Sequence, residues 1–132
     1  MDLEFDTNFT IMPTHCNYLS PLVFGGSLFS KMDLCAAVCS TRLLRHSPTG
    51  CTSAVTHKAD VTFHKPSYLG EIIYLNAKVV ELRQKAIKIH VRVEREQRLE
   101  KGRDFIAEAD FVFVSMKDGE YFKHGLEMPN GS

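Results

Sequence analysis

The feature that most constrains the fold is a single long helical segment in a chain whose other regular segments all resemble strands. Gly25 and Gly26 open this segment, and its apolar pattern continues to about Leu44 or Arg45. An irregular loop at about 13–21 precedes it. The strand-like segments lie at about 4–12, 53–64, 71–82, 86–98 and 105–116. The sequence therefore predicts the order β-α-β-β-β-β.

The segment 86–98 indicates how such a sheet is buried. Ile87, Ile89, Val91 and Val93 alternate with Lys88, His90, Arg92 and Glu94, so one face is apolar and the other polar. An apolar helix and a sheet with one apolar face bury each other if the sheet curves around the helix. We therefore expect an α+β fold in which one long central helix is wrapped by a curved antiparallel sheet of about five strands.

The chain is short enough to form one domain. We expect a single domain over residues 1–132, with its core at about 4–118 and a C-terminal tail at 119–132. The tail could be loose or cover a neighbouring subunit. The connections at 65–70 and 101–104 are short, which is typical of neighbouring antiparallel strands.

Composition argues against several classes of partner. Sixteen basic and sixteen acidic side chains give no net charge, so nothing favours nucleic acid or a membrane surface. No apolar stretch reaches about 18 residues and the N-terminus does not resemble a signal peptide, so we expect a cytoplasmic protein. The four cysteines form no CxxC motif, which predicts reduced thiols, no metal site and core positions for Cys35 and Cys39. The expected partner is a small molecule or a second copy.

One carboxylate, Asp33, lies inside the apolar helical segment. Burying an unpaired charge is costly, so a helix that is mostly core should not retain it without a use. On a helical plot Asp33 falls in a stripe of small residues made by Gly26, Ser30, Ala37 and Ser40. Such a stripe allows a sheet, a partner helix or a thin ligand to approach the backbone closely. Asp33 is therefore either a hydrogen-bonded packing residue or a functional one.

The loop and the helix start resemble the signature of hotdog-fold acyl-CoA thioesterases, in particular the bacterial YciA-like and cytosolic acyl-CoA hydrolase group. The resemblance is carried by His15 and Asn17 in the loop, Phe24-Gly25-Gly26 at the helix start and Met32-Asp33 on the helix. Similar stretches follow at 61–66, 70–71 and 109–114, so the resemblance covers about residues 10–118.

The resemblance implies a thioester hydrolase that acts on an acyl-CoA, or on a carrier-protein thioester, without a cofactor. It implies a homodimer in which two wrapped sheets join edge to edge, assembled further into a hexamer (a trimer of dimers) or a tetramer. Asp33 would act as general base or nucleophile opposite Asn17 of the partner subunit. Phe24, Gly25, Gly26 and His15 would form the oxyanion and substrate-binding site.

These residue types suit thioester hydrolysis. The reaction passes through a tetrahedral oxyanion, which unpaired N–H groups at a helix start can stabilise with help from the helix dipole. Glycine lets the substrate approach those groups closely. A partly desolvated carboxylate accepts a proton more readily near neutrality, so Asp33 can activate water or attack directly, and the Asn17 amide can orient water or the thioester.

Two segments differ from the family pattern. The loop before the helix is one residue longer and has Ser20-Pro21 in place of a glycine. The turn from Arg83 to Ala86 stands where the family has a Gly-x-Ser-Ser-like turn that contacts coenzyme A. Arg83 and Lys85, together with Lys65, are therefore candidates to bind the phosphates of coenzyme A.

Other interpretations concern the whole fold and the histidines. A non-catalytic domain that binds or senses acyl-CoA would keep the same site, and a hotdog dehydratase would need a histidine that the helix lacks before His46. No third residue is evident to orient His15 beside Cys16, so we interpret His15 as bracing the loop rather than as half of a catalytic dyad. Surface positions are expected for His46, His90 and His124.

Overall fold

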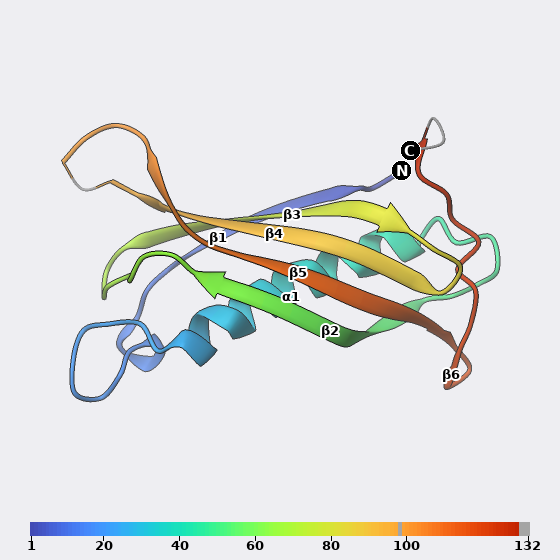
Figure 1. Cartoon of the computed structure of the whole chain (residues 1–132), viewed down its shortest axis with the longest axis horizontal. Coiled ribbons are helices and arrows are strands. Elements are labelled where there is room, and N and C mark those ends of the chain that lie inside the picture. The colour runs from blue at the N-terminus through green and yellow to red at the C-terminus, as the bar shows by residue number, and fades with distance from the viewer. Residues whose placement is uncertain (98, 130–132) are drawn as a thin grey trace.

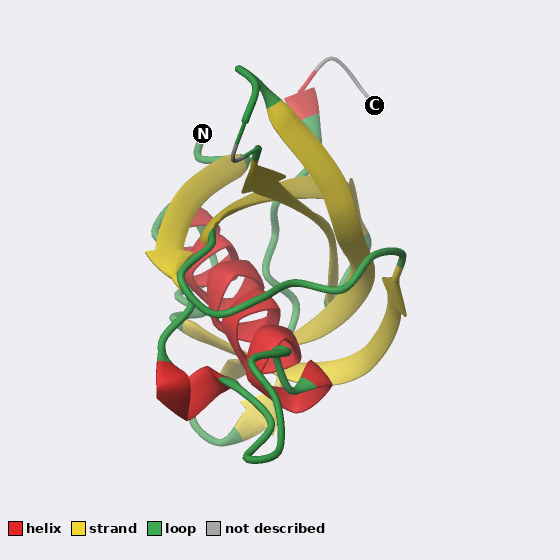
Figure 2. Cartoon of the chain, turned by 90° about the vertical axis from the view of Figure 1, so that its left-hand side faces the viewer, coloured by secondary structure: helices red, strands yellow, loops and turns green. Residues whose placement is uncertain are grey.

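The computed structural model describes residues 1–97 and 99–129 and has one long helix inside the hollow of a curved sheet (Figure 1, Figure 2). The predicted order of elements is confirmed, with the short strand β6 as an addition. No helix in these residues is long and apolar enough to cross a membrane. The elements are β1 (Glu4–Thr10), the 3-10 helix η1 (Pro13–His15), α1 (Gly25–Leu44), β2 (Ser53–Phe63), β3 (Ile72–Leu82), β4 (Ala86–Glu96), β5 (Arg103–Lys117) and β6 (Glu120–Tyr121).

The strands are ordered β1-β3-β4-β5-β2, all neighbours are antiparallel, and β6 pairs with the end of β5. β4 and β5 are neighbouring antiparallel strands, as expected, but Arg103 and Asp104 of the predicted 101–104 connection belong to β5. The expectation that 65–70 also joins neighbouring strands is wrong. β3 lies between β1 and β4, whereas β2 pairs with β5. Residues 64–71, which we call the crossover segment, therefore pass across one end of the sheet (Figure 1).

One face of α1 packs on the concave side of the sheet. Its buried residues meet the apolar face of β4, where the predicted alternation is confirmed because Ile87, Ile89, Val91 and Val93 are all buried. Cys35 and Cys39 lie in this core, as expected. Loss of hydration on burial raises the pKa of Cys35 to about 12 and that of Cys39 to about 11, so both thiols stay protonated.

The opposite face of α1 is open. Ser30, Leu34 and Thr41 are exposed on it, while Asp33 and Ala37 are half-buried. The predicted stripe of small residues therefore lies between the packed and the open sides of the helix. This placement leaves Gly26, Ser30, Asp33 and Ala37 accessible to a further surface, whereas Ser40 at the other end of the stripe is buried.

The end of the described chain packs back on its own domain, beside the C-terminal end of α1. Ser47 Oγ donates a hydrogen bond to the carbonyl of His124 at 2.6 Å. His124 is buried, its Nε2 lies 3.1 Å from the carbonyl oxygen of Ala86, and its Nδ1 accepts the N–H of Leu126 at 2.9 Å. The expected surface position of His124 is wrong, because the β5–β6 hairpin turns the chain back over the domain.

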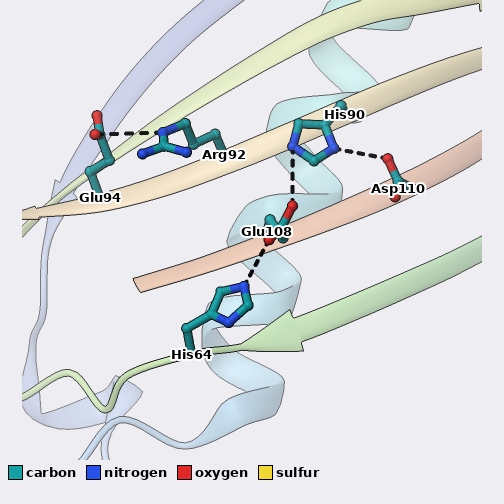
Figure 3. Close-up of polar contacts among 6 residues, drawn as sticks. All are labelled: His64, His90, Arg92, Glu94, Glu108 and Asp110. Atoms are coloured by element: carbon teal, nitrogen blue, oxygen red, sulfur yellow. Dashed lines mark hydrogen bonds and ion pairs between the residues drawn. The ribbon is translucent and has the colours of Figure 1, made fainter. Parts of the chain in front are cut away.

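Histidines alternate with carboxylates across the outer face of the sheet (Figure 3). His64 Nε2 lies 2.7 Å from the Glu108 carboxylate, whose other oxygen lies 3.6 Å from His90, and His90 Nδ1 lies 2.8 Å from Asp110. Contacts between such exposed groups contribute little to stability. Within residues 1–97 and 99–129, no group of three histidine, cysteine or acidic side chains could hold a metal ion.

We expect His124→Ala to lower the free energy of unfolding by about 2–4 kcal/mol, because it opens a cavity and leaves the Leu126 N–H without its partner. The Ala86 carbonyl loses the contact with His124 and keeps the N–H of Arg83. Urea unfolding followed by circular dichroism measures this change. His46→Ala is the matched control, since His46 is exposed and contacts Asp2 at the surface. Equal, small effects of the two substitutions would contradict the structural role of His124.

Candidate active site

The start of α1 presents backbone donors to solvent. No side chain caps the helix, and its first hydrogen bonds run from the N–H groups of Ser27 and Leu28 to the carbonyl of Phe24, at 2.9 and 3.3 Å. In the described part of the chain, the N–H groups of Gly25 and Gly26 have no such acceptor. Both glycines are exposed. The helix start can therefore donate two hydrogen bonds to an oxyanion, and the dipole favours the negative charge.

Two phenyl rings flank these glycines. A Cβ atom on Gly25 would lie 3.7 Å from the ring of Phe63, and one on Gly26 would lie 2.9 Å from the ring of Phe24. The second distance is shorter than a Cβ contact can be, so the Phe24 ring can occupy this position only because residue 26 has no side chain. Phe24 and Phe63 are themselves partly exposed. Together the rings form the sides of the approach to the backbone donors.

Asp33 lies two turns further along α1 and faces β2. Its Oδ1 accepts a hydrogen bond from the hydroxyl of Thr56 at 2.9 Å. The carboxylate is thereby oriented by one oxygen, and Oδ2 has no hydrogen-bond partner among the described residues. Thr56 is a functional candidate that the sequence analysis missed. Its contact depends on which face of β2 meets the helix, and a register shift directly after Thr56 alters the simple alternation.

Asn17 lies in the exposed loop between η1 and α1. Its Oδ1 accepts the N–H of Leu19 at 3.0 Å, and its own N–H donates to the carbonyl of Leu22 at 2.8 Å. The side-chain oxygen thus stabilises the turn, and the amide NH₂ remains as a donor at the surface. Among the described residues, no hydrogen bond joins Asn17 to Asp33. The two predicted residues are not brought together within one chain.

His15 supports the same loop. Its Nδ1 accepts the N–H of Met12 at 2.9 Å, its ring meets that of Phe9 edge to face at 5.3 Å, and its carbonyl accepts the N–H of Phe24 at 2.9 Å. These contacts agree with a bracing role directly before the helix start. The thiol of Cys16 instead lies 3.6 Å from the carbonyls of Met12 and Pro21, so it is not paired with the His15 ring.

The three basic residues assigned to coenzyme A lie at two different ends of the domain. Lys65 follows directly after β2, at the end where Phe63 meets Gly25. Arg83 and Lys85 belong to the β3–β4 turn, beside the C-terminal end of α1, and Arg83 Nε lies 2.9 Å from Glu81. The helix between these ends is about 30 Å long. One chain therefore does not gather the three residues around one ligand.

Comparison with known proteins identifies the family. The family model of the Thioesterase superfamily matches residues 20–101, which is more than half of the chain. No curated protein matches the sequence. The fold and family therefore agree with the resemblance found in the loop and helix start.

Several solved structures share the fold. Acyl-CoA hydrolase from Staphylococcus aureus, in complex with butyryl coenzyme A, coenzyme A and coenzyme A disulfide, has a TM-score of 0.81 and 24% identity over 93% of this chain and 71% of that chain. The hexameric thioesterase of Yersinia pestis has a TM-score of 0.77 and 24% identity over 89% and 91% of the two chains. The hexameric hotdog-fold thioesterase of Campylobacter jejuni has a TM-score of 0.75 and 26% identity over 91% and 95%.

These comparisons decide two of the predictions. The hotdog fold is confirmed by the long helix in its curved antiparallel sheet and by the structural neighbours. The predicted enzyme class, a thioester hydrolase, is confirmed at the level of the family. The narrower YciA-like group stays a prediction. The chain belongs to the Thioesterase superfamily.

Proposed function

We propose that the protein hydrolyses acyl-CoA thioesters to a free acid and coenzyme A, and that Asp33 is the catalytic carboxylate. The observation that carries the proposal is the Asp33–Thr56 hydrogen bond on a helix whose glycine start presents free backbone donors. The complex of the Staphylococcus aureus hydrolase with butyryl coenzyme A supports this substrate class. A carrier-protein thioester remains a second possible substrate, and a cytoplasmic location stays a prediction.

We infer that two copies of the chain complete each site. Gly25 and Asp33 are eight residues apart on one helix, or about 12 Å along its axis, which is too far for both to contact one thioester carbonyl. The open face of α1 and the exposed outer edge of β2 lie on the same side of the molecule as Asp33. Asp33 would then act opposite Asn17 and the helix start of the partner subunit.

The edge of β2 supports this dimer. β2 pairs only with β5 in the described residues, and Val55 and Phe63 on it are exposed. A long exposed edge strand is a template for pairing with another chain. Two β2 edges joined antiparallel would continue the sheet and place the open helix faces together. The Yersinia pestis and Campylobacter jejuni neighbours are hexameric, which supports assembly of such dimers into a hexamer.

In the general-base mechanism, Thr56 orients Asp33 through Oδ1, and Oδ2 accepts a proton from water. The water oxygen attacks the thioester carbon, and the carbonyl electrons form an oxyanion that the N–H groups at the helix start of the partner subunit stabilise. Collapse breaks the C–S bond, and the thiolate recovers the proton from Asp33. Direct attack by Asp33 would form an acyl anhydride that water then hydrolyses, and both routes use the same contacts.

The solved variants of the Staphylococcus aureus hydrolase support the choice of residue types. Structures of that enzyme carry alanine in place of an asparagine, an aspartate or a threonine. Asn17, Asp33 and Thr56 are the corresponding residue types in the site proposed here. Thr56 joins the set because its hydroxyl contacts the carboxylate directly.

We expect Asp33→Asn to lower kcat for acyl-CoA hydrolysis by about 100-fold or more, because the amide cannot accept the proton from water. Release of free thiol from a panel of acyl-CoAs measures kcat, and calorimetry with coenzyme A measures binding, which we expect to change less than about threefold. Asp60→Asn, on the outer face of β2, is the control. Binding without turnover by the unmutated protein would favour the acyl-CoA sensing domain instead.

We test the coenzyme A contacts with two variants, Lys65→Gln and the double variant Arg83→Gln/Lys85→Gln. Each should raise KM for acyl-CoA by about 3- to 10-fold and leave kcat little changed, because contacts to the phosphates stabilise the bound substrate and the transition state equally. The effect should shrink at high salt. Lys101→Gln, in the exposed β4–β5 loop, provides the comparison. An unchanged KM in the Arg83 and Lys85 variant would show that the β3–β4 turn is not part of any coenzyme A site.

A further inference from the structure

Arg95, near the end of β4, connects three segments that meet at the helix-start end of the sheet. Only 19% of its side chain is exposed. Its Nη1 donates to the carbonyl of Pro66 at 2.6 Å, its Nε donates to Asp104 at 3.2 Å, and Nη1 lies 3.7 Å from the carboxylate of Glu71. One guanidinium thus joins β4 to the start of β5 and to both ends of the crossover segment.

The partners of Arg95 are themselves held in place. The side chain of Glu71 is 6% exposed, and its carboxylate accepts the N–H of Tyr68 at 2.5 Å. Gln97 donates a hydrogen bond to Asp104 at 2.7 Å, and this bond is the main cause of the lowered pKa of Asp104. Burial raises this pKa, and the hydrogen bond from Arg95 lowers it further. The side chains of Glu71 and Asp104 are therefore held in place beside the guanidinium.

The crossover segment in turn holds the loop that carries Asn17. Val23 donates its N–H to the carbonyl of Ser67 at 2.9 Å, and Leu69 donates its N–H to the carbonyl of Pro21 at 2.8 Å. These bonds form a short antiparallel bridge between the loop and the crossover segment. A path of hydrogen bonds and one ion pair therefore runs from Arg95 through Pro66 and Glu71 to the loop.

On the side toward the β4–β5 hairpin, the crossover segment is not closely packed against the neighbouring residues. A hollow of about 780 Å³ lies there, and its walls include Pro21, Tyr68, Leu69, Leu99 and Asp104 as well as Arg95. The loop tip is also open, with Tyr18 92% exposed. Backbone hydrogen bonds join the two ends of the crossover segment to Ile106 of β5 and to Ile11. The side chain of Arg95 adds the link from Pro66 and Glu71 to the end of β4.

We propose that Arg95 is a positioning residue for thioester hydrolysis, which fixes the Asn17 loop by anchoring the crossover segment to the sheet. The inference rests on the proposed function, because Asn17 matters only if its loop faces a thioester. An arginine is needed because its planar fork donates to Pro66 and Asp104 at the same time. A lysine at this position would keep the charge, but its donors all lie on one nitrogen and lack the planar fork that reaches Pro66 and Asp104 from two nitrogens.

The test compares Arg95→Lys and Arg95→Met with the control Arg92→Lys in the 132-residue chain. Arg92 lies on the same strand and is likewise paired, with Glu94 at 3.6 Å, but it stacks on Phe105 at 4.0 Å and does not contact the crossover segment. Hydrogen–deuterium exchange measures the amides of residues 16–24 and 64–71. We expect about tenfold or faster exchange in both segments for the Arg95 variants only.

Kinetics then separate positioning from general stability. We expect Arg95→Lys to lower kcat by about tenfold with KM nearly unchanged. In an Asn17→Ala background it should lower kcat no further, because both substitutions remove the contribution of the correctly placed Asn17 side chain. The inference would be overturned if hydrogen–deuterium exchange of the two segments did not change in the Arg95 variants. It would also be overturned if Arg95→Lys lowered kcat by the same factor with and without Asn17→Ala. If the unmutated protein hydrolyses no thioester, the proposed function fails, and the exchange result alone decides whether Arg95 holds the loop.

Discussion

The structure depends on the one-sided burial of α1. Its apolar face packs on the concave side of the sheet, so the stripe that contains Gly26, Asp33 and Ala37 is left beside the open face. The same packing places the glycine start of the helix at one end of the sheet and orients Asp33 toward Thr56 on the edge strand β2. A helix buried on all sides could not present either its backbone donors or its carboxylate to a substrate.

Much of the fold could be predicted because it follows from local patterns. Glycines mark the helix start, and the alternation of β4 marks its buried face, so the bounds of α1 and the order of elements agree with the structure. The place of β2 in the strand order could not be predicted from the short crossover segment. It depends on pairing between strands that are remote in sequence, namely β1 with β3 and β2 with β5. The burial of His124 likewise depends on a distant partner, Ala86.

The candidate site likewise contains residues that could be predicted from the sequence and residues that could not. Asn17, Gly25, Gly26 and Asp33 could be named from the sequence because their residue types and spacing follow a family signature. Thr56 and Arg95 could not, because each acts through a contact between segments that are remote in sequence. The proposed catalytic groups thus have a local signal, whereas the residues proposed to orient them are visible only in the assembled fold.

The account rests on a site shared between two copies of the chain, and subunit mixing tests this most directly. Asn17→Ala and Asp33→Ala proteins, each with only a small residual activity alone, are exchanged, and native mass spectrometry verifies mixed dimers. A mixed dimer has one site with both residues intact, so random exchange should restore about a quarter of the unmutated activity. No recovery in verified mixed dimers would contradict the shared site.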